Sequence, residues 1–177
     1  MSHPAPANLQ DDIVSAFSVE TDKVFNRRNR QVYAIVGKNS ELKVVSEVWF
    51  GRFDTQAEFR AVLQHIFDLF GDGDYRYWLA DLRFLTSSFD ESKEWLVNQL
   101  MPAMFNAGLE REAVVLPAGT INEEGQDVFA AASDAVQKIT DGRVRSFTDI
   151  QTAKKWLLSG GLPALKTVDA NRQEQPS

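Results

Sequence analysis

A run of polar side chains, residues 81–88, follows a predicted buried strand and leads into a predicted helix. It contains an acid, a base and three hydroxyls, which are Asp81, Arg83, Thr86, Ser87 and Ser88. Ligands of open α/β sheets collect at the carboxyl ends of the strands, so these residues form the candidate partner or regulatory surface. A phosphate on one of the hydroxyls would lie where the dipole of the helix favours negative charge.

The same residues also have a purely structural interpretation. Asp81 and Arg83 can pair with each other, while Ser87 or Ser88 caps the helix that follows. Ser88 and Glu91 have the spacing of a capping box. Both interpretations place the segment at the carboxyl edge of the sheet.

Few residues are available for nucleophilic or acid–base catalysis. The chain has no cysteine and two histidines, of which only His65 lies in a predicted element. A general base needs a nucleophile within hydrogen-bond reach, and the sequence contains no G-x-S-x-G motif. We therefore expect no catalytic residues, a protein that is not an enzyme, and His65 at the surface or boundary of its helix.

Cofactor and metal motifs are missing from the sequence as well. Neither the dinucleotide fingerprint G-x-G-x-x-G nor the phosphate loop G-x-x-x-x-G-K-[ST] occurs. The one glycine-rich turn, 71–74, follows a helix instead of preceding one, and it lacks the ligands of a calcium loop. We expect no cofactor and no metal.

The charge of the chain bears on its partners. A net charge of −6 and a pI near 5.0 argue against nucleic acid. Residues 27–30 hold three arginines, which either contact a phosphate or partner or form a solvated connector before the first strand. The longest uncharged stretch, 95–109, is too short to span a membrane, and the first residues lack the pattern of a secretory signal. We expect a cytoplasmic protein with no membrane span.

The elements that must position these residues alternate between strand and helix patterns. β-Branched and aromatic runs predict strands, the first two joined as a hairpin, and apolar stripes at helical spacing predict helices. The expected strands are 31–37, 42–50, 75–82, 113–117 and 144–147, and the expected helices are 59–70, 89–107, 128–139 and 150–157. The order ββαβαβαβα predicts a mixed, mostly parallel sheet with flanking helices in a single α/β domain, residues 31–160.

The chain outside this domain is predicted to be less regular. Residues 1–30 form a polar N-terminal extension, in which only 13–17 has the pattern of a short packed element. Residues 161–177 are predicted to be a flexible C-terminal tail.

Two of the predicted helices carry clear local signals. Thr55 and Glu58 form a capping box before the helix 59–70, and Gly71 is expected to end that helix. Pro102 lies inside the pattern of the next helix. Because proline removes one backbone hydrogen bond, we expect a kink or an early end there.

An ordered series of aromatic, glycine and proline motifs runs through residues 32–159. It consists of Trp49-Phe50-Gly51, Trp78-Leu79-Ala80-Asp81-Leu82-Arg83, Trp95, Pro102, Gly108, Ala113-Val114-Val115-Leu116-Pro117 and Trp156-Leu157. In order and spacing, this series resembles the SpoIIAA-like, STAS-type domains, a family that includes uncharacterised bacterial proteins. The resemblance implies a mixed sheet flanked by helices.

The same resemblance implies a kinship in fold with anti-sigma-factor antagonists of partner-switching systems and with Sec14-type lipid-binding domains. Antagonists of the switching type carry a phosphorylatable Ser or Thr in an Asp-Ser-Ser-Gly-like turn after the corresponding strand. The counterpart here is Thr86-Ser87-Ser88-Phe89, in which both the preceding Asp and the following Gly are missing. The hydroxyls remain, but the pattern around them differs.

Two functions are expected from these observations. The first is a non-enzymatic protein-interaction or regulatory module of the SpoIIAA/STAS type, whose partner is a protein. The alternative is a carrier or sensor of a small apolar ligand or lipid, because 12 Phe, 4 Trp and 3 Met can line a pocket as well as fill a core. The edge of the predicted hairpin and exposed aromatic residues also permit a homodimer.

Overall fold

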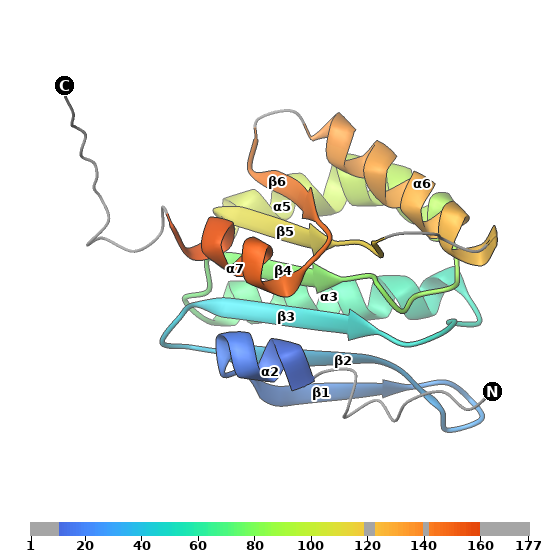
Figure 1. The fold of residues 1–177 in the computed structure, drawn as a ribbon, viewed down its shortest axis with the longest axis horizontal. Helices are drawn as coiled ribbons and strands as arrows, with labels where there is room; N and C mark the ends of the chain where they lie inside the picture. Colours follow the sequence, from blue (N-terminus) through green and yellow to red (C-terminus); the bar gives the residue numbers. More distant parts are fainter. Residues whose placement is uncertain (1–10, 119–122, 140–141, 160–177) are drawn as a thin grey trace.

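A six-stranded mixed sheet forms the centre of the fold, with helices on both of its faces (Figure 1). The computed structural model describes residues 11–118, 123–139 and 142–159. The strands are β1 (Glu20–Asn26), β2 (Val32–Asn39), β3 (Val44–Trp49), β4 (Tyr77–Asp81), β5 (Arg111–Val115) and β6 (Val144–Phe147). Their order in the sheet is their order in the chain.

The pairing of neighbouring strands changes once along the sheet, from antiparallel to parallel. β1, β2 and β3 are antiparallel neighbours, and β2 and β3 form the predicted hairpin, with Asn39 opposite Val44 next to the turn. From β3 to β6 all neighbours are parallel, because a helical connection returns the chain each time. The predicted α/β class and mixed sheet are confirmed, and the carboxyl ends of β3 to β6 lie at one edge.

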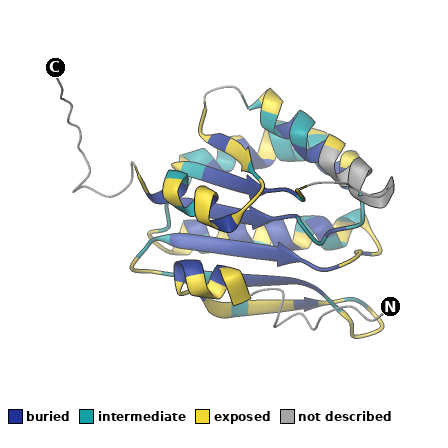
Figure 2. Ribbon diagram, viewed as in Figure 1, coloured by how far each residue is buried: buried dark blue, intermediate teal, exposed yellow. Residues whose placement is uncertain are grey.

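Helices form a layer on each face of the sheet. One layer consists of α3 (Gln56–Asp72), the connected run η1 (Asp90–Ser92), α4 (Lys93–Trp95), η2 (Leu96–Leu100) and α5 (Met101–Asn106), and α6 (Glu123–Lys138). The other layer consists of α2 (Asp11–Phe17) and α7 (Ile150–Ser159). Figure 2 shows that the central strands between these layers are buried.

Side chains alternate between the two faces along each strand and so build two hydrophobic cores. In β4, Trp78 and Ala80 belong to the larger core, under α3, whereas Tyr77 and Leu79 belong to the smaller one, under α2 and α7. A strand buried on both faces has an almost continuous apolar sequence, which is the pattern predicted here.

The connection between β3 and β4 is the regular helix α3. Its capping box is confirmed, because the Thr55 side chain accepts from the Glu58 backbone and the Glu58 side chain accepts from the Thr55 backbone. The expected end at Gly71 is wrong. The helix continues to Asp72, and the N–H of Gly73 donates to the carbonyl of Leu69 as its C-cap.

The connection between β4 and β5 is irregular, as Pro102 led us to expect. A 3₁₀ turn, η1, precedes a short α-helix, and the π-helix η2 follows, in which the N–H of Met101 donates to the carbonyl of Leu96. Pro102 stands in the first turn of α5, where its missing N–H costs least. The chain absorbs the proline by widening the helix over one turn.

The sheet contains one strand more than the sequence predicts. β1 is formed by residues 20–26, within the predicted polar extension, whereas α2 coincides with the short element predicted at 13–17. In β1 only Phe25 is buried, so the strand shows no apolar alternation. The arginine-rich stretch 27–30 is therefore the β1–β2 turn and does not precede the first strand. Residues 1–10 and the predicted tail, 161–177, lie outside the described residues.

Candidate functional site

The candidate surface leaves the carboxyl end of β4 in a defined conformation. The N–H of Gly51 donates to the carbonyl of Phe84 (2.8 Å), and the N–H of Thr86 donates to the carbonyl of Gly51 (2.6 Å). Gly51 has a φ of +66°, a left-handed conformation that glycine adopts without strain. The connection after β4 is thus paired with the connection after β3.

Asp81 and Arg83 form the pair that the structural interpretation predicts. The Arg83 guanidinium donates to both Asp81 oxygens, from Nε at 2.9 Å and from Nη2 at 2.8 Å, and Nη2 also donates to Asp12 of α2 at 2.8 Å. The Asp81 side chain is fully buried. Burial raises the pKa of the Asp81 carboxyl, and the hydrogen bonds from Arg83 offset part of that rise. These two residues fix α2 to the sheet and are not available to a partner.

The three hydroxyl residues are half-buried, and Ser87 and Ser88 contact Phe53 and Gln56 at the start of α3. Ser87 Oγ accepts from the N–H of Phe53 (3.1 Å) and donates to its carbonyl (3.2 Å). Ser88 Oγ accepts from the N–H of Asp90, the first residue of η1, at 3.1 Å. Within the described residues, the Thr86 hydroxyl has no hydrogen-bond partner.

The predicted cap therefore differs in its partner. The capping box of Ser88 and Glu91 is wrong, because η1 has no side-chain cap of that kind and Ser88 binds the N–H of Asp90 instead. The structure brings all five predicted residues to one edge of the sheet but divides them between its faces. Only the hydroxyl segment, Thr86 to Ser88, remains as a candidate contact surface.

An open groove of about 400 Å³ borders this hydroxyl segment. Its walls are Ser88, Asp90, Lys93, Ala130, Ala131 and Asp134. Lys93 lies between the two acids, with its Nζ 3.0 Å from the Asp90 carboxylate and 2.6 Å from that of Asp134. Lys93 therefore links the segment after β4 to α6 across the groove.

A polar network behind the groove holds η1 against α3. The Ser92 hydroxyl donates to Gln56 Oε1 (2.7 Å) and accepts from Arg60 Nε (3.1 Å). The Gln56 amide in turn donates to the carbonyl of Ser88 (3.0 Å). No residue of this network stands out in the sequence, because the network depends on side chains more than 30 positions apart.

Two buried glutamates, Glu47 in β3 and Glu112 in β5, form a feature that the sequence analysis missed. They are 2% and 7% exposed. Glu47 accepts one hydrogen bond from Trp78 Nε1, at 2.6 Å, and another from Trp49 Nε1. The carboxyl of Glu112 has no hydrogen-bond partner within the described residues, and both glutamates belong to the face covered by α3 and α6.

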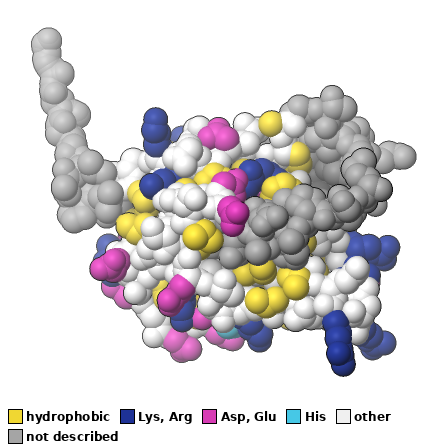
Figure 3. All heavy atoms as spheres, turned by 60° about the horizontal axis from the view of Figure 1, so that its bottom comes forward, with side chains coloured by type: hydrophobic (Ala, Val, Ile, Leu, Met, Phe, Trp, Pro, Cys, Tyr) yellow, Lys and Arg dark blue, Asp and Glu magenta, His cyan; other side chains and the backbone are white. Residues whose placement is uncertain are grey.

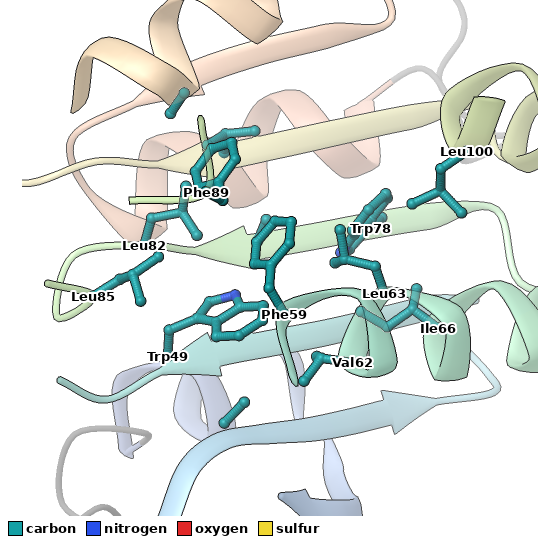
Figure 4. Packing of buried hydrophobic residues seen from close by; sticks show 14 of the residues in the cluster. Trp49, Phe59, Val62, Leu63, Ile66, Trp78, Leu82, Leu85, Phe89 and Leu100 are labelled. Carbon is teal, nitrogen blue, oxygen red and sulfur yellow. The ribbon is translucent and has the colours of Figure 1, made fainter. Parts of the chain in front are cut away.

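These two carboxyls line one small cavity in the larger core. Its volume is about 40 Å³, and most of its wall is apolar, with Phe59 and Leu63 from α3 and Ala132 and Val136 from α6. Figure 4 shows Phe59, Leu63 and Trp78 packed between the sheet and α3. Burial raises the pKa of Glu47 to about 8, against the effect of the two indole hydrogen bonds, and raises that of Glu112 well above its ordinary value.

A sequence signal for this pair existed. Each glutamate stands alone among apolar or small residues within a predicted strand or next to one, Glu47 in VVSEVWF and Glu112 before AVVL. Acids are rarely fully buried, so an acid inside a two-sided buried strand is informative. Strand patterning alone does not distinguish it from a solvent-facing position, because only the tertiary fold shows that α6 covers this face.

His65 lies at the boundary of α3, as predicted. Its Nε2 pairs with Asp22 of β1, whose other oxygen is 2.8 Å from Lys38 Nζ. In the described part of the chain, no three acidic or histidine side chains meet in a way that would hold a metal ion. None of the helices described is long and apolar enough to cross a membrane.

The surface and the comparisons add little that is specific. Acidic and basic side chains are interspersed with hydrophobic and uncharged polar ones on the face shown in Figure 3. No protein-family model and no curated protein matches the chain.

Proposed function

We propose that this chain is a non-enzymatic protein-interaction or regulatory module of the SpoIIAA-like, STAS type, working in the cytoplasm with a protein partner. One observation supports this most strongly. The hydroxyl segment Thr86 to Ser88 is held rigidly at the carboxyl edge of the parallel strands and borders an open groove. The mixed sheet with helices on both faces is compatible with such a module.

The groove offers a partner both charge and apolar surface. Asp90, Lys93 and Asp134 supply hydrogen-bonding groups, and Ala130 and Ala131 supply a small apolar wall. Because the segment after β4 is pinned by backbone bonds to Gly51, a partner would meet a surface that is already ordered.

A regulatory phosphate on Ser88 would act on the same groove. The phosphate would bring about two negative charges next to Lys93 and compete with Asp90 and Asp134 for its ammonium group. Loss of the Lys93–Asp134 contact would loosen α6 against the segment after β4. A modification at Ser88 would therefore change the shape and charge of the proposed partner surface together.

Quantitative co-purification from the native cell tests this function. The bait proteins are wild type, Ser88→Asp and, as a matched control, Ser40→Asp, which changes an exposed serine in the β2–β3 turn. We expect one protein to bind wild type and Ser40→Asp in equal amounts and Ser88→Asp at least several-fold differently, and the complex to re-form from purified components. A partner that does not distinguish the two aspartate variants, or no stoichiometric partner, contradicts the proposal.

The cavity favours a second candidate function, the carriage or sensing of a small apolar ligand. Its volume of about 40 Å³ corresponds to roughly three water-sized groups, so a lipid chain would enter only if α6 moved away. Native mass spectrometry of freshly purified protein, with thermal shifts in the presence of fatty acids, tests this candidate. An unliganded mass together with no thermal shift contradicts it.

A further inference from the structure

The carboxyl of Glu112 lies in the larger core and faces no cation among the described residues that line the cavity. It is 7% exposed, lines the cavity and has no hydrogen-bond partner within the described residues. Buried polar groups in proteins almost always have a partner, because leaving one unpaired is costly. The cavity is the place in which a partner for Glu112 would lie.

The wall of the cavity holds a second carboxyl and no cation. Both oxygens of Glu47 already accept indole N–H groups, and each keeps lone-pair capacity for a further contact. Among the described residues that line the cavity, the only ionisable ones are Glu47 and Glu112, and α3, η2, α5, α6 and β6 contribute only apolar side chains. Any positive charge there has to come from a ligand.

We propose that this cavity binds a small alkylammonium ion, with the ammonium group donating to Glu112 and its charge shared with Glu47. The alkyl part would lie against the aliphatic wall formed by residues such as Leu63, Met101 and Val136. The aromatic residues Phe59, Trp78 and Phe89 also line the cavity, and aromatic rings attract cations. This proposal goes beyond the interaction function and does not depend on it.

The size of the cavity restricts the ligand to a few heavy atoms. A volume of about 40 Å³ takes about three water-sized groups, which matches an ion such as ethylammonium. A polyamine or a quaternary ion with longer chains would not fit between the sheet and α6.

Binding of such an ion would be coupled to the loss of a proton. Burial raises the pKa of Glu112 well above its ordinary value and raises that of Glu47 to about 8, a value to which the charge of Asp81 on the other face of the sheet also contributes. A cation favours the ionised carboxylate, so each ion bound releases up to one proton. Its affinity should therefore rise with pH, by up to about tenfold per unit below pH 8.

The direct test is a titration of the ¹⁵N-labelled wild-type protein with ethylammonium chloride, followed through the indole N–H resonances. Trp49 and Trp78 contact Glu47, whereas Trp95 and Trp156 do not line the cavity and serve as internal controls. Sodium chloride at equal ionic strength and ethanol, a neutral analogue of similar size, are the reference titrations. We expect saturable shifts of the Trp49 and Trp78 resonances with ethylammonium alone.

Variants and pH complete the test. Glu112→Gln removes the negative charge from the cavity and should weaken binding by at least about tenfold, since it removes a charge-assisted hydrogen bond. Glu91→Gln changes an exposed acid and should leave the affinity unchanged. Three results would overturn the proposal. They are the absence of saturable shifts, an equal response to ethanol, and an affinity of Glu112→Gln that equals that of wild type. If Glu112→Gln fails to fold, a wild-type affinity that stays constant from pH 6 to pH 8 overturns it.

Discussion

The three most buried carboxyls of this protein differ in how they are compensated. Asp81 is paired with an arginine, Glu47 accepts two indole N–H groups, and Glu112 has no partner within the described residues. An arginine keeps its partner ionised, whereas burial without a cation favours the protonated acid. The three acids should therefore respond differently to substitution and to pH.

Glu112→Gln should become more stable relative to wild type as the pH rises. Burial raises the pKa of Glu112, so above about pH 4.5 the folded protein retains a proton that the unfolded chain releases. This lowers the free energy of unfolding of wild type by up to about 1.4 kcal/mol per pH unit until the pKa of the folded state is passed. Gln does not titrate, so urea unfolding at a series of pH values from 5 to 8 should show the variant gaining stability relative to wild type as the pH rises. A difference that does not change with pH would contradict this account.

Arg83→Ala should be strongly destabilising because it leaves the fully buried Asp81 carboxyl without its cation. Breaking a buried pair from one side costs about 3–5 kcal/mol. The matched change on the other arm of the cluster, Asp12→Ala, removes a side chain that is about half exposed and should cost less than about 1 kcal/mol. Chemical denaturation of both variants measures the difference, and equal losses would show that Asp81 does not depend on Arg83.

Among the elements, β1 depends most on a few polar contacts. It has one buried residue, and its pairing with β2 is interrupted between Thr21 and Lys23, where Asp22 bulges out. From that bulge Asp22 reaches His65 of α3 and Lys38 of β2. Polar side-chain contacts therefore hold β1 in place of much of the apolar burial that holds the inner strands.

Asp22→Asn should loosen β1 without unfolding the sheet. Burial raises the pKa of Asp22, but the hydrogen bonds from Lys38 and His65 outweigh it, so the net effect lowers the pKa. The stabilisation is therefore present above the ordinary value of 3.8 and is lost as the pH falls below it. Hydrogen exchange at neutral pH should show β1 amides exchanging about fivefold faster, equivalent to about 1 kcal/mol, with β4 unchanged. Glu20→Gln in the same strand is the control and should leave the exchange rates near those of wild type.

Helices and strands that bury one face or both faces can be predicted from the sequence. Elements held mainly by polar side-chain contacts cannot. The stripe of α3 and the apolar runs of β2 to β5 are long enough to be recognised, whereas β1 has no apolar alternation and is predicted as part of the extension. Pro102 predicted an irregularity but not its form, because a π-helix and a kink relieve the same missing hydrogen bond.

The candidate site could be predicted only in its position along the chain. The five candidate residues within 81–88 do lie at one edge of the sheet. Some of them contact Asp12 and Phe53, which are far away in the sequence, so the sequence does not predict these contacts. The groove and the cavity depend on where α6 lies. No local pattern in the sequence specifies that position.

At the scale of the whole molecule, α6 connects the two proposed sites. Ala130, Ala131 and Asp134 face the groove beside Ser88, while Ala132, Ala135 and Val136 line the cavity. The edges of the described sheet are β1 and β6, so β1 covers the hairpin edge that was expected to permit a homodimer. Bulges and the exposed Lys23 make β1 a poor edge for strand pairing, which leaves the groove as the better contact surface.

Lys93→Ala should loosen α6 specifically, because Lys93 is the cation that links Asp134 of α6 to Asp90. The Asp134 pair is partly exposed and worth less than about 1 kcal/mol, so global stability should fall little while α6 amides exchange about three- to fivefold faster. High salt should produce a similar change in wild type and little in the variant, because it screens the same contact. Lys138→Ala, which removes the other cation beside Asp134 without touching Asp90, is the control and should change the exchange of α6 less. If the α6 amides of Lys93→Ala exchanged at the wild-type rate, the Lys93–Asp134 contact would not hold α6 in place. A charge at Ser88 could then not act on α6 through Lys93.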